Sequence, residues 1–592
     1  MLGNNGQRIT IAHLSLTLVG LMWVFPFLHY RHQYPLTTFD QEWWTVLLGV
    51  LALPLLLERE CWRRPHIPRI VQLPAALIIL VLLQAALGML AYFDQALLYL
   101  LYLLFSMLLM MLGRRLREVY GLERLAFILA IFLLAGAELS ALIGVLQHYR
   151  WHTPFDAVVV MKVAAGVYGN LAQPNHFANY IALGLISLGL LFAQRKLHVA
   201  YVFALALPLL FVMTLSGSRS SWFYLIMLCV LSAWSSWKKS QLRPLLFYSL
   251  SLLGGFALMH GVVQLPFLKG AGTSYDIMQR MFADTSSGGI RVYLWHEAWL
   301  MFLQAPWLGV GFGQFAWQHF QLGPVLKNTH IVGLYNNAHN LVLQLAAEAG
   351  LAGLTVLLAG LGVWLYGLRR AVLSAAHWWG YGLLGVLGIH SLLEYPLWYA
   401  YFLAVAAVLL GALDESRYRL TLRVTGRVSV MVMLLLLLGG LSLLQLNSGY
   451  KQLKVTLSPA SGNAVQIMQR ARDGLLAVHA GSLLAPYAEL FMSHYIEIND
   501  EQIKTKLALN SKVIRFVPIA SVVYRQTFLL ARDGQLDEAR QMMRAAIWSY
   551  PANADAQRQL RSLSEKDPEH YAALLEFALQ IEQEYVSAVH NN

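Results

Sequence analysis

Polar residues that can do chemistry are gathered in a few short segments of an otherwise apolar chain. The first is residues 169–176 (GNLAQPNH), where Gln173, Asn175 and His176 place two amides and an imidazole at the start of an apolar run. Pro174 restricts the backbone there, and the N–H groups at the start of a helix favour anions. The segment therefore suits an anionic ligand, although a plain helix cap by Asn175 would also explain it.

The second segment, residues 215–221 (LSGSRSS), holds one cation among small hydroxyl residues. The guanidinium of Arg219 is permanently charged and can grip a phosphate with two parallel hydrogen bonds. The alternative is an arginine that reaches from the membrane interface to lipid head groups. A third segment, residues 291–313, holds a further candidate cation, Arg291, with an ordinary surface charge as its alternative. The nearby glycine run 309–313 (GVGFG) lacks a preceding strand, so it indicates a turn rather than a nucleotide site.

A fourth and a fifth segment border apolar runs in the second half of the chain. In residues 336–340 (NNAHN), His339 can accept a proton at neutral pH and act as a general base, although a single histidine is more often structural. In residues 390–402 (HSLLEYPLWYAYF), the aromatic side chains are typical of a belt at the membrane interface. Glu394 lies among them and needs a partner, because an unpaired carboxylate is costly in such a place.

The elements that position these segments must lie in a membrane. Of 592 residues, 58% are apolar and only 12% charged, and the mean hydropathy is +0.54. A soluble domain carries about 25% charged residues, and disordered chains are poor in apolar ones. Runs of roughly 20 apolar residues recur, which predicts an all-α polytopic membrane protein with about thirteen transmembrane helices. They are expected near residues 11–29, 43–57, 70–93, 95–113, 124–147, 176–194, 197–215, 220–237, 244–263, 339–367, 376–392, 396–413 and 428–446.

The Lys and Arg residues predict how these helices are oriented. Every second connection is basic, and with Arg8 these connections hold 20 Lys and Arg against six acids, which marks them as cytoplasmic. They account for the whole net charge of +12, so the charge is topological and no nucleic-acid partner is expected. The N-terminus is then cytoplasmic, and all five polar segments face the outer side. Two cations, a base and several amides on one face suit an anionic, phosphate-bearing lipid substrate.

The alternation divides the chain into four expected regions. They are a first transmembrane part (1–263), a large outer loop (264–338), a second transmembrane part (339–447) and an outer helical domain (448–592). Within the last region, residues 521–551 predict a helix, a turn at Asp533-Gly534 and a second helix. This spacing is similar to one tetratricopeptide unit, with a plain helical hairpin as the alternative.

Metal and nucleotide chemistry are not expected. The outer loops contain no Asp-x-Asp pair and no cysteine cluster, and the chain has only two cysteines, Cys61 and Cys229. These are the usual protein ligands of zinc and calcium, and no Walker loop is present. We therefore expect neither a metal nor another cofactor, so that any transfer reaction draws its energy from a preactivated substrate.

The chain resembles the bacterial O-linked protein oligosaccharyltransferases of the PglL type, the pilin glycosylation ligases of the O-antigen ligase/polymerase superfamily. The resemblance covers most of the chain and is most specific in residues 169–176, 338–350 (AHNLVLQLAAEAG) and 390–402. It implies an enzyme of the bacterial inner membrane with its site and C-terminal domain in the periplasm. Such an enzyme moves a preassembled glycan from undecaprenyl pyrophosphate to a Ser or Thr hydroxyl of a periplasmic protein, often type IV pilin.

The same resemblance implies roles for individual residues. The family's essential histidine falls on His339, its glutamine on Gln173 and its tyrosine on Tyr395. The phosphate-binding arginines fall on Arg219 and Arg291, the second by a looser match. Supporting substrate-binding roles are expected for Asn175, Glu394 and, as a minor contributor, His176.

Two other functions fit parts of the sequence. An O-antigen ligase or polymerase would use a glycolipid as the acceptor, and residues 390–402 together with the outer tail argue against it. A transporter of lipid-linked glycans would place charges along a central cavity, whereas the predicted spans hold few charges, mainly Glu138 and Glu348. Whether a transfer inverts or retains the anomeric centre is left open.

Overall fold

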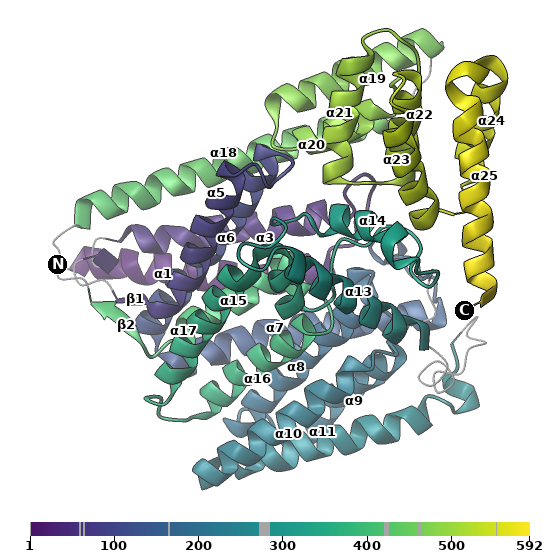
Figure 1. Cartoon of the computed structure of the whole chain (residues 1–592). Coiled ribbons are helices and arrows are strands. Elements are labelled where there is room, and N and C mark those ends of the chain that lie inside the picture. Colours follow the sequence, from purple (N-terminus) through teal and green to yellow (C-terminus); the bar gives the residue numbers. More distant parts are fainter. Residues whose placement is uncertain are drawn as a thin grey trace. The chain divides into compact units, whose positions relative to one another are not determined.

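The computed structural model describes residues 2–58, 61–62, 66–163, 166–270, 285–419, 425–459, 463–551 and 553–591. Within these residues helices dominate, and one small antiparallel sheet pairs β1 (His66–Pro68) with β2 (Arg417–Arg419) (Figure 1). The chain forms two units, and each is described by itself. Unit 1 comprises Met1–Ala76, Tyr102–Thr285 and Leu357–Leu443, and unit 2 comprises Leu77–Leu101, Ser286–Val356 and Leu444–Asn592.

Unit 1 is built from apolar helices, most of them long. They are α1 (Leu2–Met22), α2 (Phe25–Leu28), α3 (Phe39–Ala52), α7 (Leu122–Tyr149), α8 (Pro174–Ala193), α9 (Val199–Leu215), α10 (Ser220–Lys238), α11 (Arg243–Val262), α16 (Ala375–Ser391) and α17 (Ala400–Leu413). Four helices contribute to both units: α5 (Gln72–Ala86), α6 (Phe93–Tyr120), α15 (Leu341–Leu368) and α18 (Thr425–Leu457). Short 3-10 turns connect them: η1 (Leu53–Leu57), η2 (Arg69–Val71), η3 (Asp156–Val158), η4 (Gly169–Leu171), η5 (Ser240–Leu242), η6 (Pro266–Leu268) and η7 (Pro396–Trp398).

The expected class, an all-α polytopic membrane protein, agrees with these helices. In the part of the chain that the structure describes, nine helices are long and apolar enough to cross a bilayer. Every expected run overlaps a helix, but α9 and α17 have only 17 and 14 residues, so the total of thirteen spans stays a prediction. Several boundaries were wrong. The run expected near residues 70–93 ends at Ala86, because Gly88 turns the chain with a φ of +69° before α6 begins. Helices α6 and α18 continue to Tyr120 and Leu457, beyond their expected ends near residues 113 and 446.

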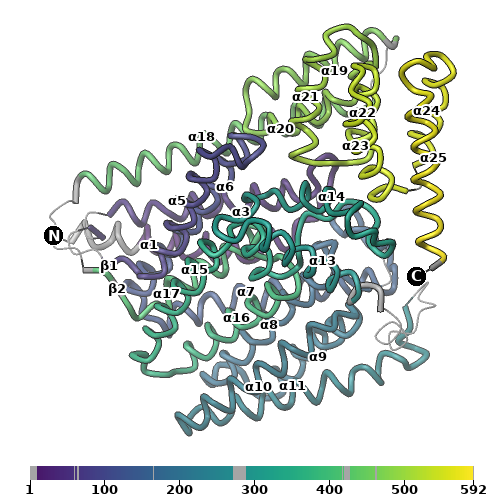
Figure 2. The backbone as a smooth tube through the Cα atoms, viewed as in Figure 1, coloured from purple at the N-terminus to yellow at the C-terminus, as the bar shows by residue number. Residues whose placement is uncertain are grey.

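The helix that follows the first polar segment lies in the middle of unit 1. Helix α8 packs against α7, α9 and α16, and it is buried from His176 to Leu191 (Figure 2). Small residues allow this close packing, since a Cβ added at Gly184 would lie 2.3 Å from the Cβ of Ala137 on α7. Close approach through small residues is how apolar helices associate in lipid. The start of α8 is therefore held rigidly by its neighbours.

Unit 2 contains the helices of the expected outer regions. They are α13 (Thr285–Gln304), α14 (Phe315–Leu326), α19 (Ala464–Gly481), α20 (Ala485–Ser493), α21 (Ile503–Phe516), α22 (Ala520–Arg532), α23 (Leu536–Ser549), α24 (Ala554–Lys566) and α25 (Pro568–Asn591). The expected helix, turn and helix within residues 521–551 are present as α22 and α23. The tetratricopeptide likeness of this hairpin stays a prediction.

The glycine run 309–313 is a turn, as expected, and it lies beside a break in α15. At Gly350 the helix is interrupted by a φ of +60°, which leaves backbone groups on both sides without helical partners. The loop before α14 supplies them: Leu351 N donates to Pro306 O at 2.7 Å, and Val310 N donates to Ala347 O at 2.9 Å. A side chain at residue 309 is impossible, because its Cβ would lie 2.2 Å from the backbone of Glu348.

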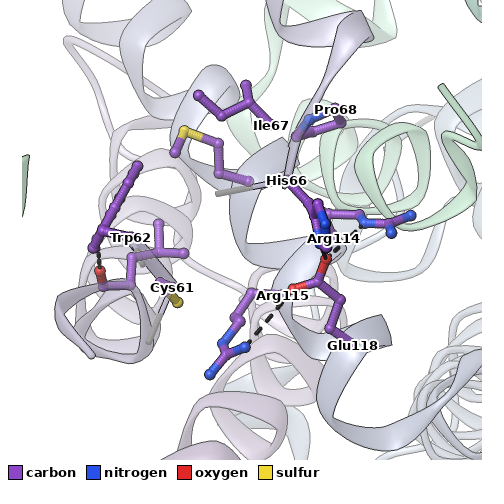
Figure 3. Close-up of a pocket in the computed structure, with 10 residues that line it drawn as sticks. Cys61, Trp62, His66, Ile67, Pro68, Arg114, Arg115 and Glu118 are labelled. Carbon is purple, nitrogen blue, oxygen red and sulfur yellow. Dashed lines mark hydrogen bonds and ion pairs between the residues drawn. The ribbon is translucent and has the colours of Figure 1, made fainter. Parts of the chain in front are cut away.

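The basic connections that indicated orientation are also structural. Figure 3 shows a pocket in unit 1 in which Arg114 and Arg115 are paired with Glu118. Arg115 also reaches Glu58 at 2.9 Å, and the Arg114 guanidinium donates to the backbone oxygen of Asp414 at 3.1 Å. Each charge is therefore neutralised locally, which permits these connections to pack against the helix ends.

Candidate functional site

The first polar segment begins α8 through an unexpected cap. The side-chain oxygen of Gln173 accepts a hydrogen bond of 2.5 Å from the backbone N–H of His176. The capping residue is therefore Gln173, and the sequence-based alternative that Asn175 caps this helix is wrong. The physical reason is position: Pro174 occupies the first turn, so the residue before it has the extended backbone that a cap requires.

Asn175 instead links three segments that are far apart in the sequence. Its amide nitrogen donates to a carboxylate oxygen of Glu394 at 2.8 Å, and its amide oxygen accepts from the Ser218 hydroxyl at 2.8 Å. Glu394 and Ser218 are both buried. The partner that Glu394 needs is therefore Asn175, and this one amide joins the first, second and fifth polar segments.

The fifth segment forms a turn between α16 and α17. The backbone N–H of Glu394 donates to His390 O at 2.7 Å, and η7 follows directly. The ring of Tyr395 stacks on that of Tyr399, with 5.8 Å between centroids. Burial raises the pKa of the Tyr395 phenol above its ordinary value, so at neutral pH this hydroxyl keeps its proton and can donate a hydrogen bond.

His176 lies among aromatic rings of the same turn. Its ring is 5.3 Å from that of His390, 5.0 Å from Tyr399 and 5.3 Å from Phe402, measured between centroids. The Tyr224 hydroxyl contacts His390 Nδ1 at 2.8 Å, which brings α10 into the cluster. The buried position of His176 fits a supporting role better than direct contact with a substrate.

Arg219 is the exposed member of this group. It directly precedes α10, and the neighbouring residues Ser218 and Ser220 are buried while Arg219 is exposed. The turn that carries it also contacts the loop before α8, because Val167 N donates to Leu215 O at 3.0 Å. The structure thus brings Arg219 to the same end of α8 as Gln173 and Asn175.

The sequence analysis assigned no role to two residues that support this site. Gln147 on α7 is buried, and it donates to Gly169 O at 2.8 Å and accepts from Gly169 N at 2.9 Å. Asn170 donates to Leu28 O and Val158 O and accepts from Val160 N. These side-chain amides form hydrogen bonds with backbone groups of the loop before α8 and so fix its conformation. The sequence signal for Gln147 is an amide inside an apolar helix, which is costly unless it has partners. Asn170 lies within the polar segment 169–176 itself.

His339 belongs to unit 2 and directly precedes the cap of α15. Its φ is +52°, an uncommon and strained value for a residue with a side chain. Asn337 accepts from the His339 N–H at 2.8 Å, and Asn340 caps the helix by accepting from Val342 N and Leu343 N. Gln344 accepts from Ala338 N at 2.7 Å. The neighbouring polar side chains therefore fix the backbone on which the imidazole is mounted.

Arg291 also belongs to unit 2, in the first turns of α13, where it is half-buried. Glu348 in the same unit accepts a hydrogen bond from Phe315 N at 3.1 Å. This carboxylate thus stabilises the start of α14 as a structural group.

The Asn175–Glu394 contact gives a direct test of this arrangement. Replacing Asn175 with Asp removes the donor and places two carboxylates face to face, which should lower the free energy of unfolding by about 1–3 kcal/mol. The double variant Asn175→Asp/Glu394→Gln restores one donor and one acceptor with their order exchanged, so most of the loss should be recovered. Thermal unfolding of the four proteins in detergent measures this coupling. Additive losses in the double variant would show that the contact contributes nothing.

Three sequence families match this chain. Residues 167–192 match the family described as protein glycosylation ligase, residues 203–358 match O-antigen ligase, and residues 378–564 match the C-terminal part of virulence factor membrane-bound polymerase. The first match covers the start of α8, and the second includes Arg219, Arg291 and His339.

Two curated relatives are both from Acinetobacter baylyi. A general O-oligosaccharyltransferase is 28% identical over 420 residues, which cover 69% of this chain and 71% of the relative. A ComP-specific O-oligosaccharyltransferase is 26% identical over 251 residues, which cover 42% of this chain and 44% of the relative. The family matches include the segments that the structure gathers around Asn175. The chain is therefore similar to protein glycosylation ligases and O-oligosaccharyltransferases, and these matches support a glycosyltransferase.

Proposed function

We propose that this enzyme transfers a preassembled glycan from undecaprenyl pyrophosphate to a Ser or Thr hydroxyl of a periplasmic protein, such as type IV pilin. The observation that carries the proposal is the junction at Asn175, which brings Gln173, Arg219 and Tyr395 to one end of α8 in unit 1. Amides, a guanidinium and a protonated phenol are the groups that recognise a diphosphate and the sugar attached to it.

The reaction requires stabilisation of the departing diphosphate. As the acceptor oxygen bonds to the anomeric carbon, the bond from that carbon to the diphosphate oxygen breaks, and the lipid diphosphate leaves with the electron pair. Arg219 and Arg291 are proposed to stabilise this charge, and a water-poor site at the membrane rim strengthens such interactions. His339 is proposed to take the proton from the acceptor hydroxyl during the attack.

The remaining residues of the junction are proposed to orient the donor. The Gln173 side-chain oxygen already holds the start of α8, so its amide nitrogen is the atom to offer to a phosphate oxygen. Tyr395 donates from its phenol. Asn175 and Glu394 hold residues 169–176 and 390–402 together, and His176 packs behind them. Their combined effect is orientation, which lowers the barrier by fixing the donor before reaction.

The helical domain of unit 2 is proposed to bind the acceptor protein in the periplasm, with the basic connections of the membrane helices in the cytoplasm. Helix α14, in the same unit as His339, packs against α23 of this domain. On α19, Val465 and Met468 are 74% and 52% exposed.

Photocrosslinking tests the role of this domain. A photoreactive residue at Val465 or Met468 should capture the acceptor, whereas one at Tyr201 on α9, which is 66% exposed, should face lipid and capture none. The products are identified by mass spectrometry. Equal capture at Tyr201, or none at α19, would contradict this part of the proposal.

Mass spectrometry of periplasmic proteins, from cells with and without this enzyme, tests the proposed reaction. The expected result is a glycan-sized mass on a Ser or Thr peptide that disappears without the enzyme. A change confined to lipopolysaccharide would indicate a glycolipid acceptor instead. Purified enzyme in vesicles should also glycosylate an added acceptor when donor and acceptor are on the same side. Passage of the donor across the bilayer without bond formation would indicate a transporter.

A further inference from the structure

The loop that carries His339 is fixed at a residue that precedes it by six positions. At Gly333 the backbone oxygen contacts His319 Nε2 at 3.2 Å, and the backbone N–H donates to Ser549 O at 2.9 Å. His319 lies on α14 and Ser549 ends α23, and both helices belong to unit 2 together with the loop. The peptide groups at Gly333 are therefore clamped from two directions.

His319 is itself held by a buried carboxylate. Its Nδ1 is 2.6 Å from Glu297 Oε2 on α13, and the two residues are only 6% and 3% exposed. A backbone oxygen accepts hydrogen bonds and cannot donate, so Nε2 must carry a proton toward Gly333. The contact with Glu297 then contains a second proton, on the nitrogen or on the oxygen, and the pair is neutral overall in either case. Such a pair is well satisfied in a buried place only while both partners remain.

Further contacts connect His319 with the loop residues that directly precede His339. The edge of the His319 ring meets the ring of Tyr335, with 5.6 Å between centroids. Tyr335 packs in a small core with Leu294, Phe315 and Ala338. The backbone N–H of Ala338 donates to Gln344, and Ala338 directly precedes His339 with its strained backbone. A strained residue keeps its conformation only when its surroundings determine it.

We propose that Glu297 and His319 are positioning residues that hold the His339 loop in its reactive conformation. The proposal rests on the proposed function, in which His339 acts as the base. It assigns no contact with substrate to either residue. Misplacement of a catalytic group by about 1 Å can cost about 100-fold in rate. The contacts of Glu297 and His319 therefore affect the rate of transfer, although neither residue touches the substrate.

Three substitutions separate positioning from simple stability. His319→Phe keeps a ring against Tyr335 but loses both polar contacts, and Glu297→Leu removes the partner of Nδ1. Both should lower kcat about 10- to 100-fold, with KM for the lipid-linked donor changed less than about twofold. Glu297→Gln should retain at least about half of kcat, because its amide can donate to Nδ1 while Nε2 still donates to Gly333. A matched control is His330→Phe, an exposed histidine in the same loop that stacks on Tyr293, which should leave kcat unchanged.

Hydrogen exchange of residues 331–340 in the full-length protein gives a readout that does not depend on activity. Exchange there should accelerate about tenfold or more in His319→Phe and Glu297→Leu, while α14 and α23 stay protected. Unchanged loop exchange with normal kcat, or equal loss in Glu297→Gln and Glu297→Leu, would overturn the clamp. If His319→Phe does not fold, Glu297→Leu carries the same test. Normal transfer by His339→Ala would instead refute His339 as the base. The exchange result would then test only whether Glu297 and His319 hold the loop.

Discussion

Replacement of His339 by alanine is expected to lower the rate of glycan transfer by about 10²- to 10⁴-fold. The acceptor hydroxyl holds its proton tightly at neutral pH, so its attack on the anomeric carbon requires a positioned base. His339 is mounted on a strained backbone between two asparagines that bond to the neighbouring N–H groups. The bonds to Asn337 and Asn340 are donated by backbone N–H groups, which the variant keeps, so the change removes the imidazole while these loop contacts remain.

The control for this variant is His330→Ala in the same loop, which should retain normal transfer. Initial rates with a purified lipid-linked donor and a folded acceptor measure the effect, and donor binding should change little. Partial restoration of His339→Ala by added imidazole would identify proton transfer as the missing function. Normal pilin glycosylation by His339→Ala would eliminate the assigned role.

Loss of the guanidinium at Arg219 is expected to have the second-largest effect. Arg219→Ala should reduce kcat by about 10²- to 10³-fold, a typical loss when one group that stabilises developing negative charge is removed. Arg219→Lys should also be impaired despite its retained charge, because an ammonium cannot form two parallel bonds to one phosphate group. The buried residues beside Arg219 hold the turn, which keeps the loss local to the guanidinium.

Arg31→Lys serves as the matched control. Arg31 is an exposed arginine of another connection that the charge pattern places on the outer side, and its replacement should leave the rate unchanged. Rates measured at saturating donor separate binding from catalysis. Wild-type turnover by Arg219→Lys would show that the arginine only contacts lipid head groups.

Local patterns were sufficient for much of the fold. Each expected apolar run overlaps a helix, because a helix satisfies its own backbone groups and needs no distant partner in lipid. The break in α15 was not visible in this way. Glycines recur along α15, so Gly350 does not mark a break by itself, and the break depends on backbone groups supplied by residues 306–311.

The candidate site was only partly predictable for the same reason. Residue types near helix ends pointed to Gln173, Arg219, His339 and Tyr395 as chemically able groups. The sequence favoured Asn175 as a cap, however, whereas the structure assigns that bond to Gln173. The partner of Glu394 is 219 residues away along the chain, and no local pattern reports such a separation.

The sequence by itself determined the class of the protein, because the hydropathy and the alternation of basic connections are additive properties of single residues. It also pointed to the segments that we propose bind a phosphate. Tertiary structure alone decided which polar side chains are available for chemistry and which are used to hold backbone. Gln147, Asn170 and His319 belong to the second group, since each is buried and its partners come from other helices or loops. A buried polar group must be paired, and only the packing of distant segments determines with what.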